Sequence, residues 1–498
     1  MDGNKVHPLA KLDHRYLWHP FTQMRGWLKR EPIVIVEGQG AVLRDVRGRE
    51  YLDANSSIWV NLHGHNHPKL NAAINGQLER IAHSSALGFA NEPASLLGAK
   101  LVEAANPPRK RGKRKQPPLS KVFFSDDGST ATEVALKLAY EFTRRTGRSR
   151  KPKFLCLDGA YHGDTVGAVS LGHIDLFHKA YSGLLFQTDK VIPPYCYRCR
   201  FNRAKPERAD ARTYRKCHWE CLGALDRKLA AQRKRGNPYA AFVFEPLMQG
   251  AAGMIPQPRG WLHQASEIAR GYGALLIADE VMTGFGRTGS GKVTGERIAS
   301  PRTAAAEPEA APGPGRPWFA CHQEGVQPDF LALAKGLTGG YLPMAATLTT
   351  QQVFNAFLGG YEEFKTFFHG HSFTGNQLGA AAGLASAELL SSPESVRARV
   401  RLEEVLREEL NGLWSCQNVG DIRQVGLVVG VELVKDWRAR QPFDLRERAG
   451  IRVCEAMARR GVLTRPIGSV VVLMPPYCTT PDQARQMVRA LGAALRTL

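Results

Sequence analysis

Two side chains that could share one chemical task stand at the ends of apolar runs. Lys335 follows the run 330–334, and Asp279 closes the run 274–278. Apolar runs of this length, bounded by glycine or charge, predict buried strands of a parallel sheet. Ligands of open α/β sheets bind beyond the carboxyl ends of such strands. A lysine amine can bond covalently to the aldehyde of pyridoxal phosphate, and a carboxylate can pair with the pyridinium nitrogen, so the two residues suggest a site for this cofactor.

A turn that could bind phosphate supports the same hypothesis. Residues 122–124 predict a short strand, and the turn 125–130 leads into a helical pattern. Thr130 with Glu133 three residues later fits a capping box. The free amide groups and positive dipole end of such a helix suit a phosphate group. An ordinary capped helix would have the same pattern, so the turn alone does not decide.

Several further segments resemble one family. The segments are 18–24, 62–68, 159–165, 244–246, 279–289, the run around Lys335, 368–376 and 464–466. In these residues the chain resembles the class III pyridoxal-phosphate aminotransferases over nearly its whole length. The lysine and aspartate segments mark the class. The Trp-His-Pro-Phe-Thr segment 18–22 and the segment around Arg465 mark the branch that serves biotin biosynthesis.

The resemblance implies an α/β protein with the fold type I architecture of pyridoxal-phosphate-dependent transferases. A mostly parallel central sheet is expected in a large domain, residues 67–390, and a smaller α/β domain in residues 391–498. Residues 1–66 are expected to contribute to the small domain. Two segments look inserted: the basic, proline-rich residues 106–119 and the Ala/Pro/Gly-rich residues 290–317, which predict disorder. The second insertion explains the long separation of Asp279 from Lys335.

The resemblance also assigns roles to the cofactor site. Lys335 would hold the cofactor and move a proton between donor and cofactor carbons. Asp279 would keep the pyridine nitrogen protonated. Gly128 and Ser129 would hold the phosphate, and Tyr161 would cover the ring and touch the substrate.

Four further residues match the family's substrate side and subunit interface. His371 and Ser372 correspond to a second phosphate contact that comes from the partner subunit, which implies a homodimer. Gly370 would line the same pocket. Arg465 corresponds to the arginine that binds the carboxylate of the amino acceptor, a task that suits its fork of donors. The role of Glu245 stays open between a structural one and the exclusion of other donors.

The implied reaction is transamination of 8-amino-7-oxononanoate to 7,8-diaminononanoate. S-adenosylmethionine is the usual donor in this branch and is expected here. However, Phe21 and Ile58 stand where the pattern for that donor has tyrosine and tryptophan, and both losses weaken a site for a sulfonium. A branch that uses L-lysine has a similar segment 57–59, so lysine stays an alternative. A broader class III ω-aminotransferase is the runner-up activity.

The charge balance does not indicate a nucleic-acid-binding protein. The chain has 67 lysines and arginines against 46 acidic residues, a net charge of +21. The positive charges gather in runs at 109–115 and 144–153 without the interleaved aromatics that would stack on bases. We expect no specific nucleic-acid binding. The intact lysine and aspartate segments also argue against a catalytically dead interaction protein.

No apolar run of about 18 residues exists, so no transmembrane helix is expected, and the charged start of the chain predicts no secretory signal. The cytoplasm is the expected location.

Four of the nine cysteines cluster in sequence: Cys196, Cys199, Cys217 and Cys221. Their spacing is plausible for a zinc ribbon, with His218 as a spare ligand. A surface loop with free thiols is the alternative. The expected catalytic chemistry needs no metal, so the question stays open.

Overall fold

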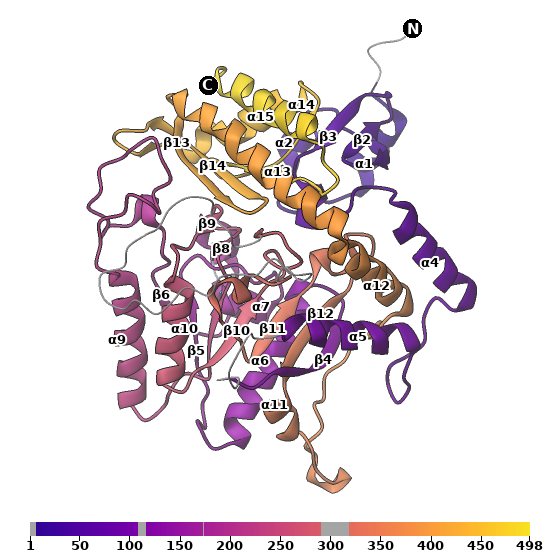
Figure 1. Ribbon diagram of the computed structural model, residues 1–498, viewed down its shortest axis with the longest axis vertical. Helices are drawn as coiled ribbons and strands as arrows, with labels where there is room; N and C mark the ends of the chain where they lie inside the picture. The colour runs from indigo at the N-terminus through magenta and orange to yellow at the C-terminus, as the bar shows by residue number, and fades with distance from the viewer. Residues whose placement is uncertain (1–5, 108–115, 173, 290–317) are drawn as a thin grey trace.

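The computed structural model describes residues 6–107, 116–172, 174–289 and 318–498 (Figure 1). The insertion predicted at 290–317 lies outside these ranges, as does most of the one predicted at 106–119. The segments that flank the longer insertion contact each other directly. The amide of Gly286 donates to the carbonyl of Trp318 at 2.9 Å. The Gln323 side-chain amide donates to the carbonyl of Gly289 at 3.1 Å.

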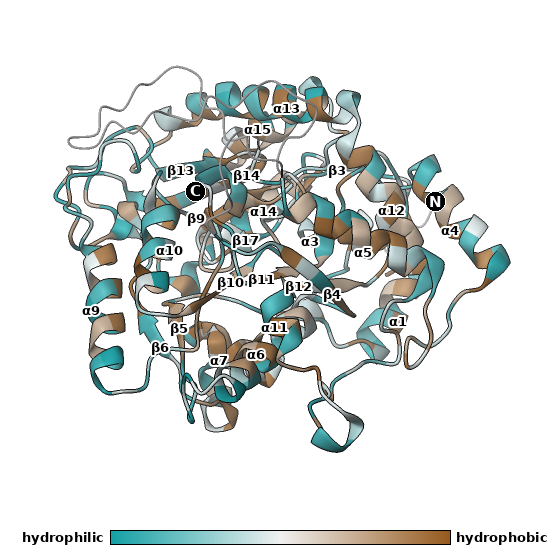
Figure 2. Ribbon diagram, turned by 60° about the horizontal axis from the view of Figure 1, so that its bottom comes forward, coloured by the Kyte–Doolittle hydropathy of each residue, from teal (hydrophilic) through white to brown (hydrophobic). Residues whose placement is uncertain are grey.

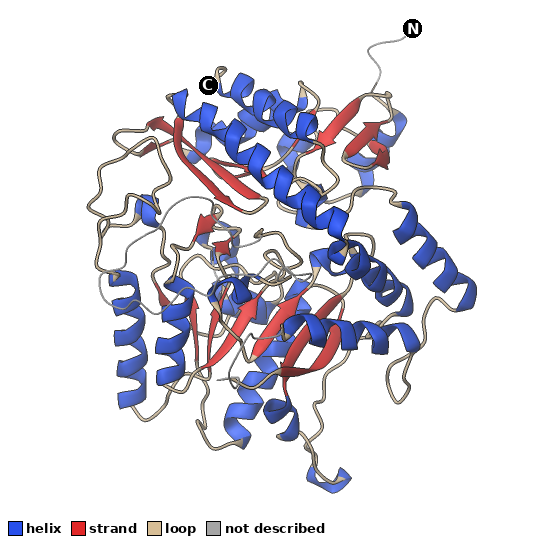
Figure 3. Ribbon diagram, viewed as in Figure 1, coloured by secondary structure: helices blue, strands red, loops and turns tan. Residues whose placement is uncertain are grey.

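A seven-stranded sheet forms the centre of the molecule (Figures 1 and 3). Its order is β4 (Leu119–Ser125), β12 (Ala345–Thr350), β11 (Phe330–Leu333), β10 (Leu275–Asp279), β7 (Ala241–Phe244), β5 (Phe154–Leu157) and β6 (Asp189–Val191). Every neighbouring pair is parallel except the two that involve β12. The predicted mostly parallel sheet is therefore confirmed.

Helices bury both faces of this sheet. Alternate strand residues such as Ile277 and Phe330 pack with α6 (Gly128–Arg145) in one core cluster. Their neighbours Leu276 and Leu331 join a second cluster on the opposite face. That cluster includes α5 (Glu92–Ala105), α9 (Glu220–Lys234), α10 (Trp261–Gly271) and α12 (Gln377–Ser391). Burial on both sides explains why the strands are continuous apolar runs. Helices α9 and α13 (Pro393–Asn411) show both hydrophilic and hydrophobic residues along their surfaces (Figure 2).

A second, antiparallel sheet belongs to the C-terminal part of the chain. It contains β13 (Val419–Val425), β14 (Val428–Asp436), β18 (Val470–Leu473) and β17 (Pro466–Ile467), and β15 (Gln441–Pro442) pairs with β14. Helices α13 (Pro393–Asn411), α14 (Ala449–Ala458) and α15 (Pro481–Leu495) pack against one another beside it.

A third sheet joins the two ends of the chain. Strands β1 (Ile35–Gln39), β2 (Val42–Asp45) and β3 (Glu50–Asp53) form a meander, and β16 (Val462–Leu463) pairs parallel with β3. Figure 1 shows the first and last helices at the same end of the molecule. The pairing supports an N-terminal contribution to the small domain, although the exact boundaries at 66 and 390 stay predictions.

The remaining short elements are α1 (Pro8–Tyr16), α2 (Met24–Trp27), α3 (Ser56–Trp59), α4 (Pro68–Arg80), α7 (Val166–Leu171), α8 (Asp175–His178), α11 (Gln351–Asn355), β8 (Met248–Gln249) and β9 (Ile255–Pro256). In the described ranges, no helix has the length and apolar content needed to cross a membrane.

The packing of the central sheet gives a first prediction. Leu276 is fully buried on β10. Leu276→Ala should destabilise the protein by about 2–5 kcal/mol, because it removes buried methyl groups and leaves a cavity. Leu445→Ala serves as the matched control, since Leu445 is 60% exposed. Thermal unfolding of both variants checks the difference, and an equal effect of the two substitutions would contradict the assigned burial.

Candidate active site

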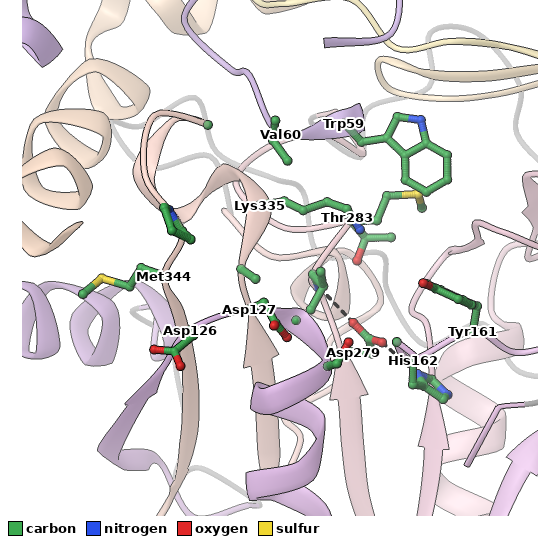
Figure 4. A pocket seen from close by; sticks show the side chains of 18 of the residues that line it. Trp59, Val60, Asp126, Asp127, Tyr161, His162, Asp279, Thr283, Lys335 and Met344 are labelled. Atoms are coloured by element: carbon green, nitrogen blue, oxygen red, sulfur yellow. Dashed lines mark hydrogen bonds and ion pairs between the residues drawn. The ribbon is translucent and has the colours of Figure 1, made fainter. Parts of the chain in front are cut away.

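Lys335 and Asp279 come together at the carboxyl edge of two neighbouring strands. Asp279 ends β10 and lies opposite Ala332 of the parallel strand β11. Two residues after β11 ends, Lys335 begins a short 3₁₀ turn with a left-handed φ of 43°. Figure 4 shows both side chains in one pocket of about 450 Å³. The sequence prediction that strand ends present these two groups to a common site is thus met by the geometry.

The Lys335 amine sits where it can act as a nucleophile. Its Nζ lies 5.2 Å from the centre of the Trp59 ring, and Asp279 and Glu245 are its charged neighbours. Burial lowers the pKa of Lys335, and the two carboxylates offset only part of this effect. A larger share of the amine is therefore neutral near pH 7 than in an exposed lysine, and the neutral form is the one that attacks an aldehyde.

Trp59 reaches the pocket from a strained segment. Ser56, Ser57 and Trp59 have φ values of 47°, 61° and 64°, which non-glycine residues rarely adopt. Hydrogen bonds hold them there: the Ser57 amide donates to Asp53 at 2.8 Å, and the Trp59 indole donates to Asn55 at 2.9 Å. Strain maintained by its surroundings is typical of functional segments. In the sequence Trp59 stood only as the retained member of a tryptophan pair in which Ile58 is the departure, and nothing placed it beside Lys335.

Asp279 forms a buried pair with His162, a residue that sequence reasoning missed. Nδ1 of His162 lies 2.7 Å from Oδ2 of Asp279, and the His162 side chain is fully buried (Figure 4). Burial alone would lower the pKa of His162, but the hydrogen bond and charge of Asp279 raise it overall. The amide of Val281 donates to the other Asp279 oxygen at 3.0 Å. The carboxylate is therefore fixed in orientation. The only sequence signal was the place of His162 inside the matched segment 159–165.

Glu245 has a structural task in this arrangement. Its carboxyl group accepts the amides of Tyr161 at 3.2 Å and Gly250 at 2.7 Å. Burial raises its pKa to about 7, with Asp279 adding to the effect and His162 opposing it. Glu245 thus orients the backbone of Tyr161, which supports the structural role. It also lines the pocket of Lys335, so a role in excluding other donors stays a prediction.

The start of α6 forms the anion-binding side of the pocket. Asp127 caps this helix: its carboxylate accepts the Thr130 amide at 2.9 Å, and the Thr130 hydroxyl in turn accepts the Asp127 amide. The predicted capping box of Thr130 with Glu133 is therefore wrong by one helical turn. Glu133 instead accepts the Thr165 hydroxyl and the Gly167 amide. The aspartate is the better cap because it precedes the first helical residue, where three amides lack partners.

Gly128 and Ser129 occupy the first two helical positions and line the pocket. A Cβ atom on Gly128 would lie 2.7 Å from Val281, so the backbone must approach this residue closely. Free first-turn amides at a close-packed glycine are a suitable cradle for a phosphate group. The residues present therefore fit pyridoxal phosphate, with the phosphate at α6 and the ring between Lys335 and Asp279.

Tyr161 also lines the pocket, as the sequence predicted. Its hydroxyl donates to Asp164 at 2.5 Å, and the Asp164 amide donates to the Ser129 hydroxyl at 3.2 Å. Burial, together with Asp164, raises the pKa of Tyr161. The phenol therefore stays protonated and connects the ring-binding side of the pocket to the phosphate side.

Four predicted site residues do not line this pocket. Gly370 and Ser372 are exposed, and Arg465 is exposed just before β17. His371 lies at the rim, where its Nδ1 is 2.9 Å from Asp126, a residue that does line the pocket. The roles of all four stay predictions.

The fold and this pocket together define a pyridoxal-phosphate-dependent enzyme of fold type I. A lysine, a carboxylate and a helix N-terminus meet where the parallel strands of the sheet end and the loops begin. Pyridoxal phosphate bound there would supply an electron sink.

Comparison with known proteins identifies the family. The family model described as aminotransferase class-III matches residues 26–292 and 309–495. This chain belongs to the class III aminotransferases, which depend on pyridoxal phosphate.

Similar proteins extend over the full length of the chain. The adenosylmethionine-8-amino-7-oxononanoate aminotransferase of Geobacter sulfurreducens is 43% identical over 98% of both chains. A crystal structure of the enzyme of that name from Methanocaldococcus jannaschii is 36% identical, with a TM-score of 0.83 and 98% coverage of both chains. An amine transaminase from an uncultivated Pseudomonas species, solved in its PLP-bound form, is 30% identical, with a TM-score of 0.81 over 97% of this chain and 98% of that one.

A second prediction concerns Lys335. Lys335→Ala should lower turnover by about 10²-fold or more, because proton transfer by a positioned group contributes at least that much. The absorbance of the lysine-bound cofactor should also vanish, while circular dichroism stays unchanged because alanine fits the same backbone. Lys121→Ala, on β4 outside the pocket, is the control. Turnover by Lys335→Ala at the wild-type rate would refute the assignment of the site.

A third prediction concerns the pH dependence of the Asp279–His162 pair. A histidine whose pKa is raised by folding contributes stability that is complete below its unfolded pKa of about 6.5 and is lost as pH rises through the folded value. The cofactor-free protein should therefore lose thermal stability above about pH 6.5. His162→Gln should flatten this dependence, whereas His263→Gln, at an exposed position, should preserve it. An unchanged profile in His162→Gln would show that the pair does not titrate with folding.

Proposed function

We propose that this protein transfers an amino group to 8-amino-7-oxononanoate and forms 7,8-diaminononanoate for biotin biosynthesis. One observation carries the proposal: proteins named for this reaction match the chain at 42–43% identity over 98% of its length. The pocket supports it, because the lysine, the carboxylate and the phosphate cradle that a transamination requires are all present.

The pocket residues divide the work between binding and proton transfer. Gly128 and Ser129 would hold the cofactor phosphate, and Asp279, oriented by His162, would hold positive charge at the ring nitrogen. The Lys335 amine would take and return the proton at the substrate carbon. Trp59 and Tyr161 exclude water from this amine. The same residues serve both half-reactions, first with the donor and then with the acceptor.

Arg465 is proposed to bind the carboxylate of the acceptor. Its guanidinium is exposed and precedes β17. Burial raises the pKa of the Cys454 thiol to about 12, and Arg465 is close enough to oppose part of this rise. A bidentate guanidinium fork suits a carboxylate at the end of a long aliphatic chain.

Replacing this arginine gives a fourth prediction. Arg465→Ala should raise KM for 8-amino-7-oxononanoate by about 10- to 100-fold, the loss expected for a charged hydrogen bond. The KM for the amino donor should change far less. Arg459→Ala, an exposed arginine at the end of α14, is the control. Equal changes in the KM values of both substrates would argue against a role specific to the acceptor.

S-adenosylmethionine is the proposed donor, because the similar proteins carry it in their names. L-lysine is the second candidate, and Phe21 and Ile58 favour it. Phe21 has no hydroxyl group and packs edge-on against Phe177 at 5.2 Å, and Ile58 is aliphatic and 47% exposed beside Trp59. Where these two side chains face the donor, a sulfonium donor loses hydrogen-bond and cation–π contacts, whereas the slimmer lysine loses less.

A fifth prediction tests the role of Phe21 and Ile58 in the choice of donor. The double change Phe21→Tyr with Ile58→Trp should raise the ratio of S-adenosylmethionine to lysine turnover by roughly tenfold or more, if the new contacts form in the transition state. Diaminononanoate formed from each donor in separate assays measures the ratio. An unchanged ratio would mean that these positions do not select the donor.

The same pair of assays tests the proposed function itself. Wild-type protein is incubated with 8-amino-7-oxononanoate and one donor at a time, and 7,8-diaminononanoate is measured. Product from either donor supports the proposal. Turnover of simple diamines or ω-amino acids without any turnover of 8-amino-7-oxononanoate would instead establish the broader ω-aminotransferase.

We further propose a cytoplasmic homodimer with shared active sites. Large apolar side chains are exposed around the segment that carries Gly370, His371 and Ser372: Phe368 is 75% and Phe373 is 59% exposed. His83 ties this segment to a neighbouring loop by donating to the Ser372 carbonyl at 2.8 Å. A second copy of the chain would bury these side chains and receive His371 and Ser372 at its phosphate site.

A further inference from the structure

Four cysteines outside the active site surround one small cavity. Cys196, Cys199, Cys217 and Cys221 line an enclosed space of about 20 Å³, separate from the pocket of Lys335. Cys196 and Cys221 are 9% exposed, and each thiol lies within electrostatic range of the others. Residues separated by up to 25 positions in sequence thus meet at one point, and no step of transamination uses them.

Two turns of the backbone carry the cysteines around the cavity. The amide of Asn202 donates to the carbonyl of Cys199, and the Asn202 side chain bonds the carbonyl of Cys196 and the amide of Lys216. These bonds hold the first turn against the irregular segment that carries Cys217. Cys221 lies in the first turn of α9, where the helix dipole favours a negatively charged sulfur.

One hydrogen-bond donor points at a sulfur atom: Nη1 of Arg215 lies 3.3 Å from the sulfur of Cys217. Trp261 packs in the same core cluster as Cys221, and its buried indole N–H has no hydrogen-bond partner among the described residues. A neutral thiol accepts hydrogen bonds weakly, whereas a metal-bound thiolate accepts them well. The donors therefore fit sulfur atoms that carry negative charge.

Cys196 and Cys221 are buried, and four negative sulfur atoms around one small cavity would repel one another unless a cation lay among them. In the described ranges, no three cysteine, histidine, aspartate or glutamate side chains are already arranged as a metal site. Side-chain rotation must therefore draw the four sulfur atoms inward around an ion.

The cysteine-rich segment 193–221 lies at a place in the fold where a rigid segment would hold two sheets together. It lies beside β13 and above α9 in Figure 1 and connects the central sheet to the C-terminal sheet. Arg198 pairs with Glu432 of β14 at 2.5 Å, and Arg212 donates to the carbonyl of Gln424 on β13 at 3.0 Å. Cys196, Tyr197 and Ala211 form a small core of their own with two partly buried tyrosines, and Cys221 joins the main core. A cross-link among the cysteines would stiffen so small a core.

We propose that Cys196, Cys199, Cys217 and Cys221 bind one Zn²⁺ as a structural four-thiolate site. Binding releases four protons and leaves a complex of charge −2, which Arg215 and the Trp261 N–H stabilise from outside the first coordination sphere. Four thiolates in a tetrahedron are the commonest structural zinc set. The ion would clamp the segment where it contacts β13 and β14.

The test uses untagged, full-length holoenzyme from zinc-supplemented cells. Mass-spectrometric metal analysis should find one zinc per chain, and a thiol-specific mercurial should release it to a colorimetric chelator as four cysteines react. Absence of zinc with four titratable thiols, a disulfide among these cysteines, or iron in place of zinc would each overturn the proposal. This measurement does not depend on any variant or on the identity of the substrate.

Two variants locate the ion. Cys199→Ser with Cys217→Ser should lose the zinc, whereas the matched pair Cys416→Ser with Cys478→Ser, outside the cluster, should retain it. Trp261→Phe removes the indole N–H while it keeps an aromatic side chain, and it should weaken zinc binding by roughly 10-fold or more. Cofactor absorbance confirms that each variant has folded. Zinc retained by Cys199→Ser/Cys217→Ser would place the ion elsewhere and refute the site.

Discussion

The buried ion pair of Asp279 and His162 is the interaction on which the rest of the active site depends. A buried carboxylate at the carboxyl edge of an apolar sheet is costly without a partner, and a hydrogen bond of 2.7 Å to a histidine with a raised pKa supplies one. The pair fixes the orientation of the carboxylate that would pair with the cofactor's ring nitrogen. Glu245, Tyr161 and Ser129 are then connected to each other by backbone and side-chain hydrogen bonds, so the ring and phosphate sides of the pocket keep a constant separation.

The parallel sheet explains how the pattern of apolar runs in the sequence produces this geometry. Two runs that are apolar at every position must be covered on both faces, and core clusters on either side of β10 and β11 show that they are. Polar residues can then appear only where the strands end. Asp279 and Lys335 are at those ends on adjacent parallel strands, which is why residues far apart in sequence share one pocket.

Much of this could be predicted from the sequence, and the failures have physical causes. The strands, Lys335, Asp279, Gly128, Ser129 and Tyr161 followed from local pattern and family resemblance. His162 did not, because a histidine inside a glycine-rich turn gives no sign of which distant carboxylate it will contact. The cap of α6 was misplaced by one turn since both Asp127 and Thr130 can serve as caps, and only the backbone decides. Arg465 and His371 stay untested by the single chain, because their proposed partners are a substrate and a second subunit.

The contact between the flanks of residues 290–317 has an evolutionary consequence. Gly286 is hydrogen-bonded to Trp318 and Gly289 to Gln323, so the described residues on either side of this stretch lie next to each other. The entropic cost of closing a loop grows only slowly with the number of residues in the loop. Selection is therefore free to lengthen, shorten or replace this stretch without moving β10 relative to β11. The number of residues between Asp279 and Lys335 can then differ between lineages, whereas the chemistry of the site requires the two side chains to stay close in space.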